Sequence, residues 1–291
     1  MLIRKYPNGN EYLRADNTWV RNFTKENFSP KEINKFFNKN DYGLIYKNEQ
    51  INQKFPKISD EKLVFKKIVI ISDGYKFDEK HLFLGKLPKD VCVLAVNNAL
   101  KKWKLLSEET LPENKRTING YVINNPYKEA LNFLPYKNSL YFPACISSTR
   151  TNLEFTKKYK GDVYVYKPSS EQDFGFDSNE SYHIEDYRNP ICAAIMLAYQ
   201  FGVEKLMLAC CDDSFEDKRD AAIELKNGLY TYEPLLKSQS IIDAVLYWLT
   251  HQEDRKVSVS DYSAGVNYQN AQYITNEENA CSFFENNMEG F

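Results

Sequence analysis

The sequence predicts an α/β fold in which a mostly parallel sheet is flanked by helices. Between residues 61 and 254, apolar segments of strand length alternate with segments of helical periodicity, which is typical of βαβ units. The strand segments are almost continuously apolar, as expected for strands that are covered on both faces. A chain of 291 residues is also long enough to bury a full core without metal ions or disulfide bridges.

The expected elements follow from these patterns in chain order. Strands are expected at residues 67–72, 91–96, 120–123, 139–142, 162–166 and 205–210. Helices are expected at residues 99–105, 152–159, 190–201 and 234–250. Together they predict a Rossmann-like nucleotide-binding domain over residues 61–254.

The two flanking segments differ from this domain. Residues 1–60 begin with short β segments around the turn signal Pro7-Asn8-Gly9 and continue as a polar connector with a short helix. They predict a small β-rich N-terminal appendage. Residues 255–291 are polar apart from one aromatic run, and we expect this tail to pack back on the domain as strand or loop.

Composition and charge exclude several classes of protein. The net charge of −2 excludes a strongly basic binder, so nucleic acid is not expected as the main partner. No run approaches the roughly 18 apolar residues of a membrane span, and the first residues lack the apolar core of a signal peptide. We therefore expect a cytoplasmic protein. The six cysteines are expected to be buried free thiols, because none forms a C-x-x-C pair.

The first candidate site residues follow directly after expected strands, where ligands of an open parallel sheet bind. Ser72, Asp73 and Gly74 follow the first strand, and glycine permits a close approach to a ligand, although an ordinary turn has the same composition. Asn97 and Asn98 follow the second strand. Their amides suit a base edge or a sugar hydroxyl, or they cap the helix that follows.

Two further pairs lie later in the chain. Arg188 and Asn189 precede an apolar helix, whose free N–H groups favour an anion; the alternative is a core helix capped by Asn189. Asp212 and Asp213 follow the strand at residues 205–210. Adjacent carboxylates there suit a Mg²⁺ ion on nucleotide phosphates or a general base, and the alternative is a capping aspartate.

The order of these segments resembles the DUF115 (MptE-like) family, which includes archaeal 6-hydroxymethyl-dihydropterin diphosphokinases. Motility accessory factors and sialyltransferases that use CMP-sugars are related to it. The similarity covers about residues 62–250, and its strongest part is Ala198, Gly202 and Lys205 followed by an apolar strand and Asp212. The family has Gly-x-Asp where this chain has Cys210-Cys211-Asp212.

The chain departs from the family pattern in its loops. Ser72-Asp73-Gly74 stands where the family places Gly-x-Gly-Pro-Ser against nucleotide phosphate. Tyr187-Arg188-Asn189-Pro190 stands where the family has Ser-Gly-Gly-Ser.

The resemblance implies a nucleotide-dependent transferase of the diphosphokinase type, which acts on Mg-ATP and a small hydroxylated acceptor. Asp212 and Asp213 would then be catalytic and hold Mg²⁺. The loop at residues 72–74 and the pair Arg188 and Asn189 would bind the nucleotide phosphates, and Asn97 and Asn98 would orient its base or sugar. The first alternative is a CMP-sugar-dependent glycosyltransferase. The second is a non-catalytic Rossmann-like interaction module, which the altered glycine loops suggest. The oligomeric state is not predicted.

Overall fold

The computed structural model describes most of the chain. The described residues are 3–6, 9–13, 19–21, 39–103, 118–135, 142–168, 183–184, 186–187, 189–212, 214, 222–225, 229–231, 233–265 and 268–285. Asp213 and Arg188, which the sequence singles out as site residues, lie outside these ranges.

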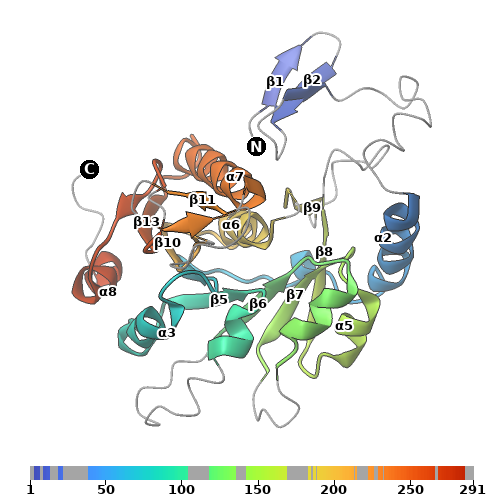
Figure 1. Ribbon diagram of the computed structural model, residues 1–291, viewed down its shortest axis with the longest axis horizontal. Helices are drawn as coiled ribbons and strands as arrows, with labels where there is room; N and C mark the ends of the chain where they lie inside the picture. The colour runs from blue at the N-terminus through green and yellow to red at the C-terminus, as the bar shows by residue number, and fades with distance from the viewer. Residues whose placement is uncertain are drawn as a thin grey trace.

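A nine-stranded sheet forms the centre of the described structure (Figure 1). Its strand order is β14-β13-β10-β4-β5-β6-β7-β8-β9, and each pair of neighbours is parallel. The strands are β4 (Lys67–Ile71), β5 (Cys92–Val96), β6 (Gly120–Ile123), β7 (Ala144–Ser148), β8 (Val163–Pro168), β9 (His183–Ile184), β10 (Lys205–Ala209), β13 (Ser258–Tyr262) and β14 (Gln272–Tyr273). The predicted Rossmann-like α/β fold is therefore confirmed.

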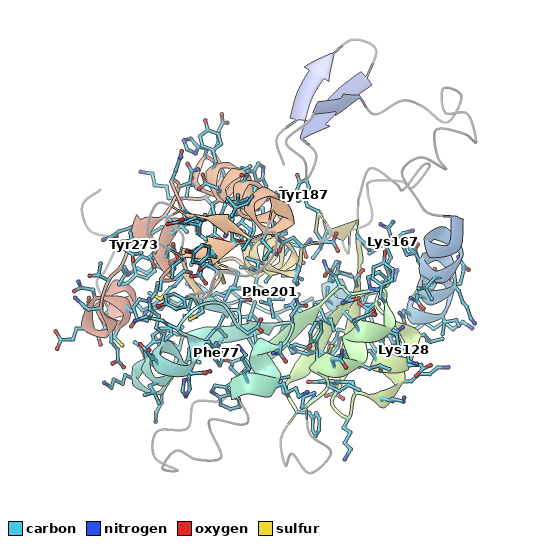
Figure 2. The ribbon with its side chains drawn as sticks, in the orientation of Figure 1. Phe77, Lys128, Lys167, Tyr187, Phe201 and Tyr273 are labelled. Atoms are coloured by element: carbon cyan, nitrogen blue, oxygen red, sulfur yellow. The ribbon has the colours of Figure 1, made fainter. Side chains whose placement is uncertain are left out.

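Helices cover both faces of this sheet (Figures 1 and 2). One face carries α6 (Pro190–Gln200) and α7 (Glu233–Thr250). The other face carries α3 (Phe77–Lys80), η3 (His81–Lys86), η5 (Lys128–Phe133), α5 (Leu153–Lys158) and α8 (Glu277–Glu285). Strand side chains alternate between these two layers, so the β4 residues Ile68 and Ile70 pack under α6, while Val69 and Ile71 face the opposite layer.

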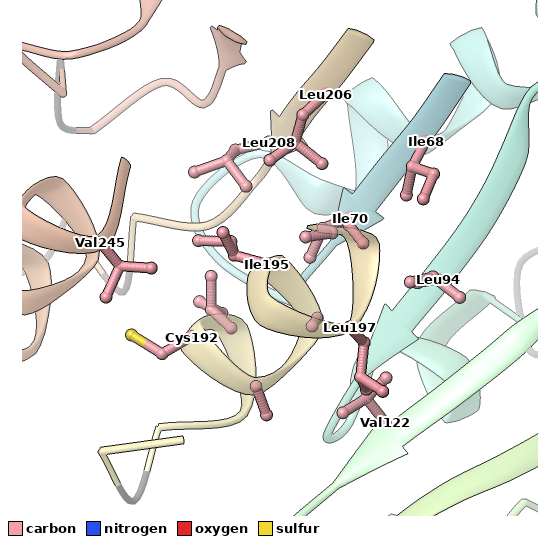
Figure 3. Close-up of a cluster of buried hydrophobic side chains, with 14 of the residues drawn as sticks. Ile68, Ile70, Leu94, Val122, Cys192, Ile195, Leu197, Leu206, Leu208 and Val245 are labelled. Atoms are coloured by element: carbon pink, nitrogen blue, oxygen red, sulfur yellow. The ribbon is translucent and has the colours of Figure 1, made fainter. Parts of the chain in front are cut away.

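Helix α6 lies flat on the middle of the sheet because nearly all of its residues are apolar and four of them are alanine or cysteine. Figure 3 shows Ile195 and Leu197 of α6 packed among Ile70 of β4, Leu94 of β5 and Val122 of β6, with Leu206 and Leu208 of β10 beside them. Its Ala193, Ala194 and Ala198 are fully buried and let the helix approach the strands closely. This packing fixes the start of α6 above the carboxyl ends of the central strands.

Three short strands at the N-terminus form a separate antiparallel sheet in the order β1-β2-β3. They are β1 (Ile3–Tyr6), β2 (Gly9–Leu13) and β3 (Trp19–Arg21). This is the β-rich appendage that the turn signals predict. Two further short strands, β11 (Ile223–Glu224) and β12 (Tyr230–Thr231), pair antiparallel with each other.

One expected strand lies mostly outside the described residues. The strand predicted at residues 139–142 falls outside the described residues except for Phe142, which is not in a strand. The strand at this point of the sheet is β7 (Ala144–Ser148), which follows Pro143. Pro143 has no backbone N–H to donate to a sheet, and among the described residues the pairing begins after it, at Ala144.

The C-terminal residues belong to the sheet itself. β13 lies between β10 and β14 and pairs with β10 along its whole length, from Lys205 opposite Ser258 to Ala209 opposite Tyr262. Residues 255–291 therefore contribute two strands and the helix α8 to the same layered structure as residues 61–254.

Helix α2 (Lys39–Asn52) was expected to be part of a connector, yet it is bonded into the fold. Asn52 is fully buried and donates through Nδ2 to the carbonyl oxygens of Thr149 (3.0 Å) and Thr151 (2.7 Å). Its Oδ1 accepts from the Thr156 hydroxyl (2.9 Å). Asn48 donates in the same way to the carbonyl oxygens of Pro126 and Arg150. Two asparagine side chains thus attach α2 to the loops after β6 and β7.

We predict that Asn52→Ala lowers the free energy of unfolding by about 2–3 kcal/mol, because it removes the donor that bonds the Thr149 and Thr151 carbonyl oxygens and one of the two acceptors of the Thr156 hydroxyl. Chemical denaturation measures this change. Gln50→Ala is the matched control, since Gln50 is exposed on the same helix. Equal losses for the two variants would show that the Asn52 bonds do not hold α2 in place.

Candidate functional site

The strand order reverses next to β4. The chain runs outward from β4 through β5 to β9 and then returns to place β10 on the other side of β4. In open α/β sheets, the crevice outside the carboxyl ends of such a strand pair is where ligands bind. The loops after β4 and β10 meet here, as Ser72 N–H donates to the Ala209 carbonyl (3.0 Å) and Gly74 N–H to the Cys210 carbonyl (2.9 Å).

The Asp212 carboxylate connects three loops at this reversal. Its Oδ1 accepts from the Tyr75 N–H (3.0 Å) in the loop after β4. Its Oδ2 accepts from the Ser214 hydroxyl (3.0 Å) in its own loop and from the Gly265 N–H in the loop after β13. The residue is fully buried, so these bonds replace the water that the charged group would otherwise bind.

Two glycines allow the backbone to approach this carboxylate. A Cβ atom added to Gly74 would lie within 2.1 Å of Asp212 Oδ1, and one added to Gly265 would lie within 2.4 Å of Asp212 Oδ2. Neither distance leaves room for a methyl group. Cys210, at the position of the family's glycine, adopts a left-handed conformation with φ of 52°.

The Asp212 carboxylate does not fit the role of a direct magnesium ligand. Mg²⁺ requires accessible oxygen ligands in near-octahedral geometry, whereas both oxygens of this buried carboxylate already accept hydrogen bonds from the protein. Burial raises the pKa of Asp212, and its hydrogen bonds oppose that rise. Among the described residues, no three His, Cys, Asp or Glu side chains are arranged to hold a metal ion. A role for Asp213 stays a prediction.

The start of α6 is capped by the protein itself. Asn189 Oδ1 accepts from the N–H groups of Ile191 (2.8 Å) and Cys192 (3.3 Å), and its backbone carbonyl accepts from Ala193. Pro190 has no N–H group. The first-turn donors that were expected to bind an anion are therefore used by the N-cap.

Asn189 nevertheless lies near the other candidates. Its Nδ2 donates to the Ser238 hydroxyl of α7 (2.6 Å), and the next residue of α7, Gln239, donates to the backbone carbonyl of Asp212. The start of α6 is thus bonded to the same edge of the sheet as Asp212.

An accessible polar group lies at the ends of β4 and β5. Asp73 Oδ2 accepts from Asn98 Nδ2 (3.1 Å) and is 3.8 Å from the Lys102 ammonium, which also donates to the Asp73 carbonyl (3.2 Å). The Asp73 side chain is 28% exposed. Asn97 beside it has a positive φ of 47°, and within the described ranges its buried Oδ1 has no hydrogen-bond partner. The predicted residues of these two loops are therefore brought together.

A second buried carboxylate, which was not expected from the sequence, lies at the end of β13. Asp261 is fully buried, and its Oδ1 accepts from the Ser263 N–H (2.9 Å), while Oδ2 has no hydrogen-bond partner in the part of the chain that is described. Burial, reinforced by the Asp212 charge, raises the pKa of Asp261 to about 6. The alternating pattern from Val257 to Asp261 was the available signal for a strand.

A further polar network occupies the ends of β6 to β9. The Tyr166 hydroxyl (3.0 Å) and Asn124 Nδ2 (3.3 Å) both donate to Asp186 Oδ2. Burial raises the pKa of Tyr166, and the neighbouring Asp186 charge raises it further. Nearby, Arg150 and Lys167 lie 3.8 Å and 4.0 Å from the two oxygens of Glu49 in α2. The carboxyl edge of the sheet is therefore polar well beyond the reversal.

No protein-family model and no curated protein matches this chain. The resemblance to the MptE-like family stays a prediction. Within the ranges that the structure describes, no helix is long and apolar enough to cross a membrane.

We predict that Asp212→Asn lowers the free energy of unfolding by about 2–4 kcal/mol, because in either orientation of the amide its NH2 group faces one of the two backbone N–H groups, that of Tyr75 or that of Gly265. Thermal and chemical denaturation measure the loss. Asp243→Asn is the control, since Asp243 accepts one backbone N–H, from Asn270 (3.0 Å), through an oxygen that the amide keeps. An unchanged stability of Asp212→Asn would contradict the structural role of this carboxylate.

We also predict a pH dependence that Asp261 causes. Its pKa is about 6 in the folded protein, against an ordinary value of 3.8 that we take for the unfolded chain. Between these two pH values, Asp261 is deprotonated in the unfolded chain while it still holds its proton in the folded protein. The free energy of unfolding therefore falls as pH rises through this range. Asp261→Asn removes this effect. The stability of the variant relative to the wild type should rise by up to about 3 kcal/mol between pH 4 and pH 7.5. Parallel stability curves over this range would contradict the prediction.

Proposed function

We propose that the protein is a nucleotide-dependent transferase that binds its nucleotide across the carboxyl ends of β4 and β5, next to the strand-order reversal. The observation that carries this proposal is the convergence of the loops at residues 72–74, 97–98 and 210–212 at this edge of the sheet. In this fold class such a crevice is the usual place for a nucleotide.

Buried oxygens without hydrogen-bond partners at the same edge of the sheet support the binding of a polar ligand there. Two buried side-chain oxygens there have no partner among the described residues: Asn97 Oδ1 and Thr149 Oγ1. Buried polar atoms in native proteins are nearly always hydrogen-bonded, so unpaired atoms indicate a missing partner. An acceptor such as Asn97 Oδ1 suits the exocyclic amino group of adenine or cytosine.

The first candidate reaction is a diphosphokinase-type transfer from ATP to a small hydroxylated acceptor. The chain's own contribution would be to hold the two substrates in line, because positioning supplies much of the catalysis in phosphoryl transfer. Asp212 would act indirectly, by fixing the loop at residues 72–75 and the loop after β13. No step is assigned to a metal ion at Asp212.

The second candidate is glycosyl transfer from a CMP-sugar. The bonding of both Asp212 oxygens within the protein favours it, since this reaction requires no metal-ligating carboxylate in the chemical step. A small-molecule acceptor with a hydroxyl group is required in both cases.

Calorimetric titration with ATP and Mg²⁺, ATP with EDTA, and CMP with EDTA tests the proposal. Binding of ATP that depends on Mg²⁺ supports the kinase-type reaction, whereas binding of CMP in EDTA supports glycosyl transfer. Asn97→Gly keeps the positive φ and removes the acceptor, so we expect a loss of about five- to tenfold in affinity. Lys76→Gly is the control, because Lys76 is exposed and has a positive φ of 60°.

Failure of the wild type to bind a nucleotide in any of the three titrations would overturn the proposal. The non-catalytic interaction module would then be the remaining hypothesis.

A further inference from the structure

The accessible acceptors of the crevice come from two neighbouring strands. Asp73 follows β4 and Asn98 follows β5, and the bond from Asn98 Nδ2 to Asp73 Oδ2 holds the two side chains together. Among the described residues, the hydrogen bonds and ion pairs of the Asp73 carboxylate involve Oδ2, so Oδ1 keeps its full accepting capacity. Asn98 uses its amino group in this bond and keeps its carbonyl oxygen as an acceptor.

Lys102, in the helical turn that follows Asn98, contacts Asp73 and stabilises the position of its carboxylate. Its ammonium donates to the Asp73 backbone carbonyl (3.2 Å) and lies 3.8 Å from Oδ2. The cation therefore fixes the loop at Asp73 and partly offsets its charge on the side that faces Asn98. The position of the carboxylate is set before any ligand arrives.

A pair of acceptors selects a ligand with two donors. Asp73 Oδ1 and the Asn98 carbonyl oxygen accept hydrogen bonds, and they repel the oxygens of a phosphate group. Two hydroxyl groups on adjacent carbon atoms match them, and acidic side chains bind ribose hydroxyls in this way in dinucleotide-binding folds. In those folds the acid follows the second strand, whereas here it follows the first strand of the unit and an amide follows the second.

We propose that Asp73 and Asn98 bind the 2′,3′-diol of the nucleotide's ribose, so that the loop at residues 72–74 recognises a sugar instead of phosphate. This inference rests on the proposed function, because it requires that the crevice binds a nucleotide. It reverses the role that the family resemblance gives to this loop. It agrees with the capped start of α6, whose first N–H groups are already bonded to Asn189.

The test compares ATP with 2′,3′-dideoxy-ATP, and CMP with 2′,3′-dideoxy-CMP, by calorimetric titration of the full chain. The wild type should bind the ribonucleotide at least about tenfold more tightly, since hydrogen bonds to a charged acceptor contribute more than neutral ones. Asp73→Asn replaces one acceptor by a donor at the same size. It should reduce the preference to less than about threefold while leaving the affinity for the dideoxynucleotide unchanged.

Two controls separate recognition from folding. Asp78→Asn changes an exposed carboxylate in the first turn of α3 and should keep the wild-type preference. Asn98→Ala should lower the preference in the same direction as Asp73→Asn, and melting temperatures report the integrity of each variant.

The outcomes distinguish the two proposals. Nucleotide binding with equal affinity for the ribo and dideoxy forms would overturn the inference and leave the proposed function intact. An undiminished ribose preference in Asp73→Asn would also overturn it. If no nucleotide binds at all, both the proposed function and the ribose site are wrong.

Discussion

The binding edge of the sheet depends on the hydrogen bonds of one buried carboxylate. In a parallel sheet, the loops after β4, β10 and β13 emerge side by side, and the backbone bonds between the loops after β4 and β10 end at Gly74 and Cys210. Asp212 supplies acceptors to all three, through the N–H groups of Tyr75 and Gly265 and the hydroxyl of Ser214. Removing a charged group from water is costly, and three hydrogen bonds offset that cost only while the loops keep this arrangement. The shape of the crevice and the burial of Asp212 therefore depend on each other.

The polar side chains at this edge of the sheet have to form hydrogen bonds with the chain itself as well as with a ligand. Backbone N–H groups are unpaired where strands end and where helices begin, so capping side chains gather where ligands bind. Asn189 and Asp212 use their polar atoms in this way, whereas Asp73 and Asn98 are a partly exposed pair among the candidate residues that the structure describes. Burial decides which of the two roles a side chain has. A buried side chain stabilises loops, while a partly exposed one is able to contact a ligand.

Glycine stands at other places in these loops than in the family pattern that the sequence resembles. The residue two before Asp212 is Cys210, which adopts the left-handed conformation that glycine adopts most easily. Gly74 and Gly265 instead provide the space against the Asp212 carboxylate. Glycine here lets backbone approach a side chain of the protein, whereas a phosphate-binding loop uses glycine to let backbone approach the ligand. The carboxylate of Asp73 in the first loop is consistent with this change of partner.

The sequence by itself determined the layered architecture and the capped helix α6, because continuous apolar runs and an Asn-Pro start depend on local chemistry. It also indicated which loops meet at the reversal. It did not determine that β13 lies inside the sheet or that α2 is held by Asn48 and Asn52, since polar segments are buried only when distant partners satisfy them. Nor could it separate structural from accessible acids: Asp212, Asp261 and Asp73 all follow or end strands, and only the tertiary structure decides which of them remains in contact with water.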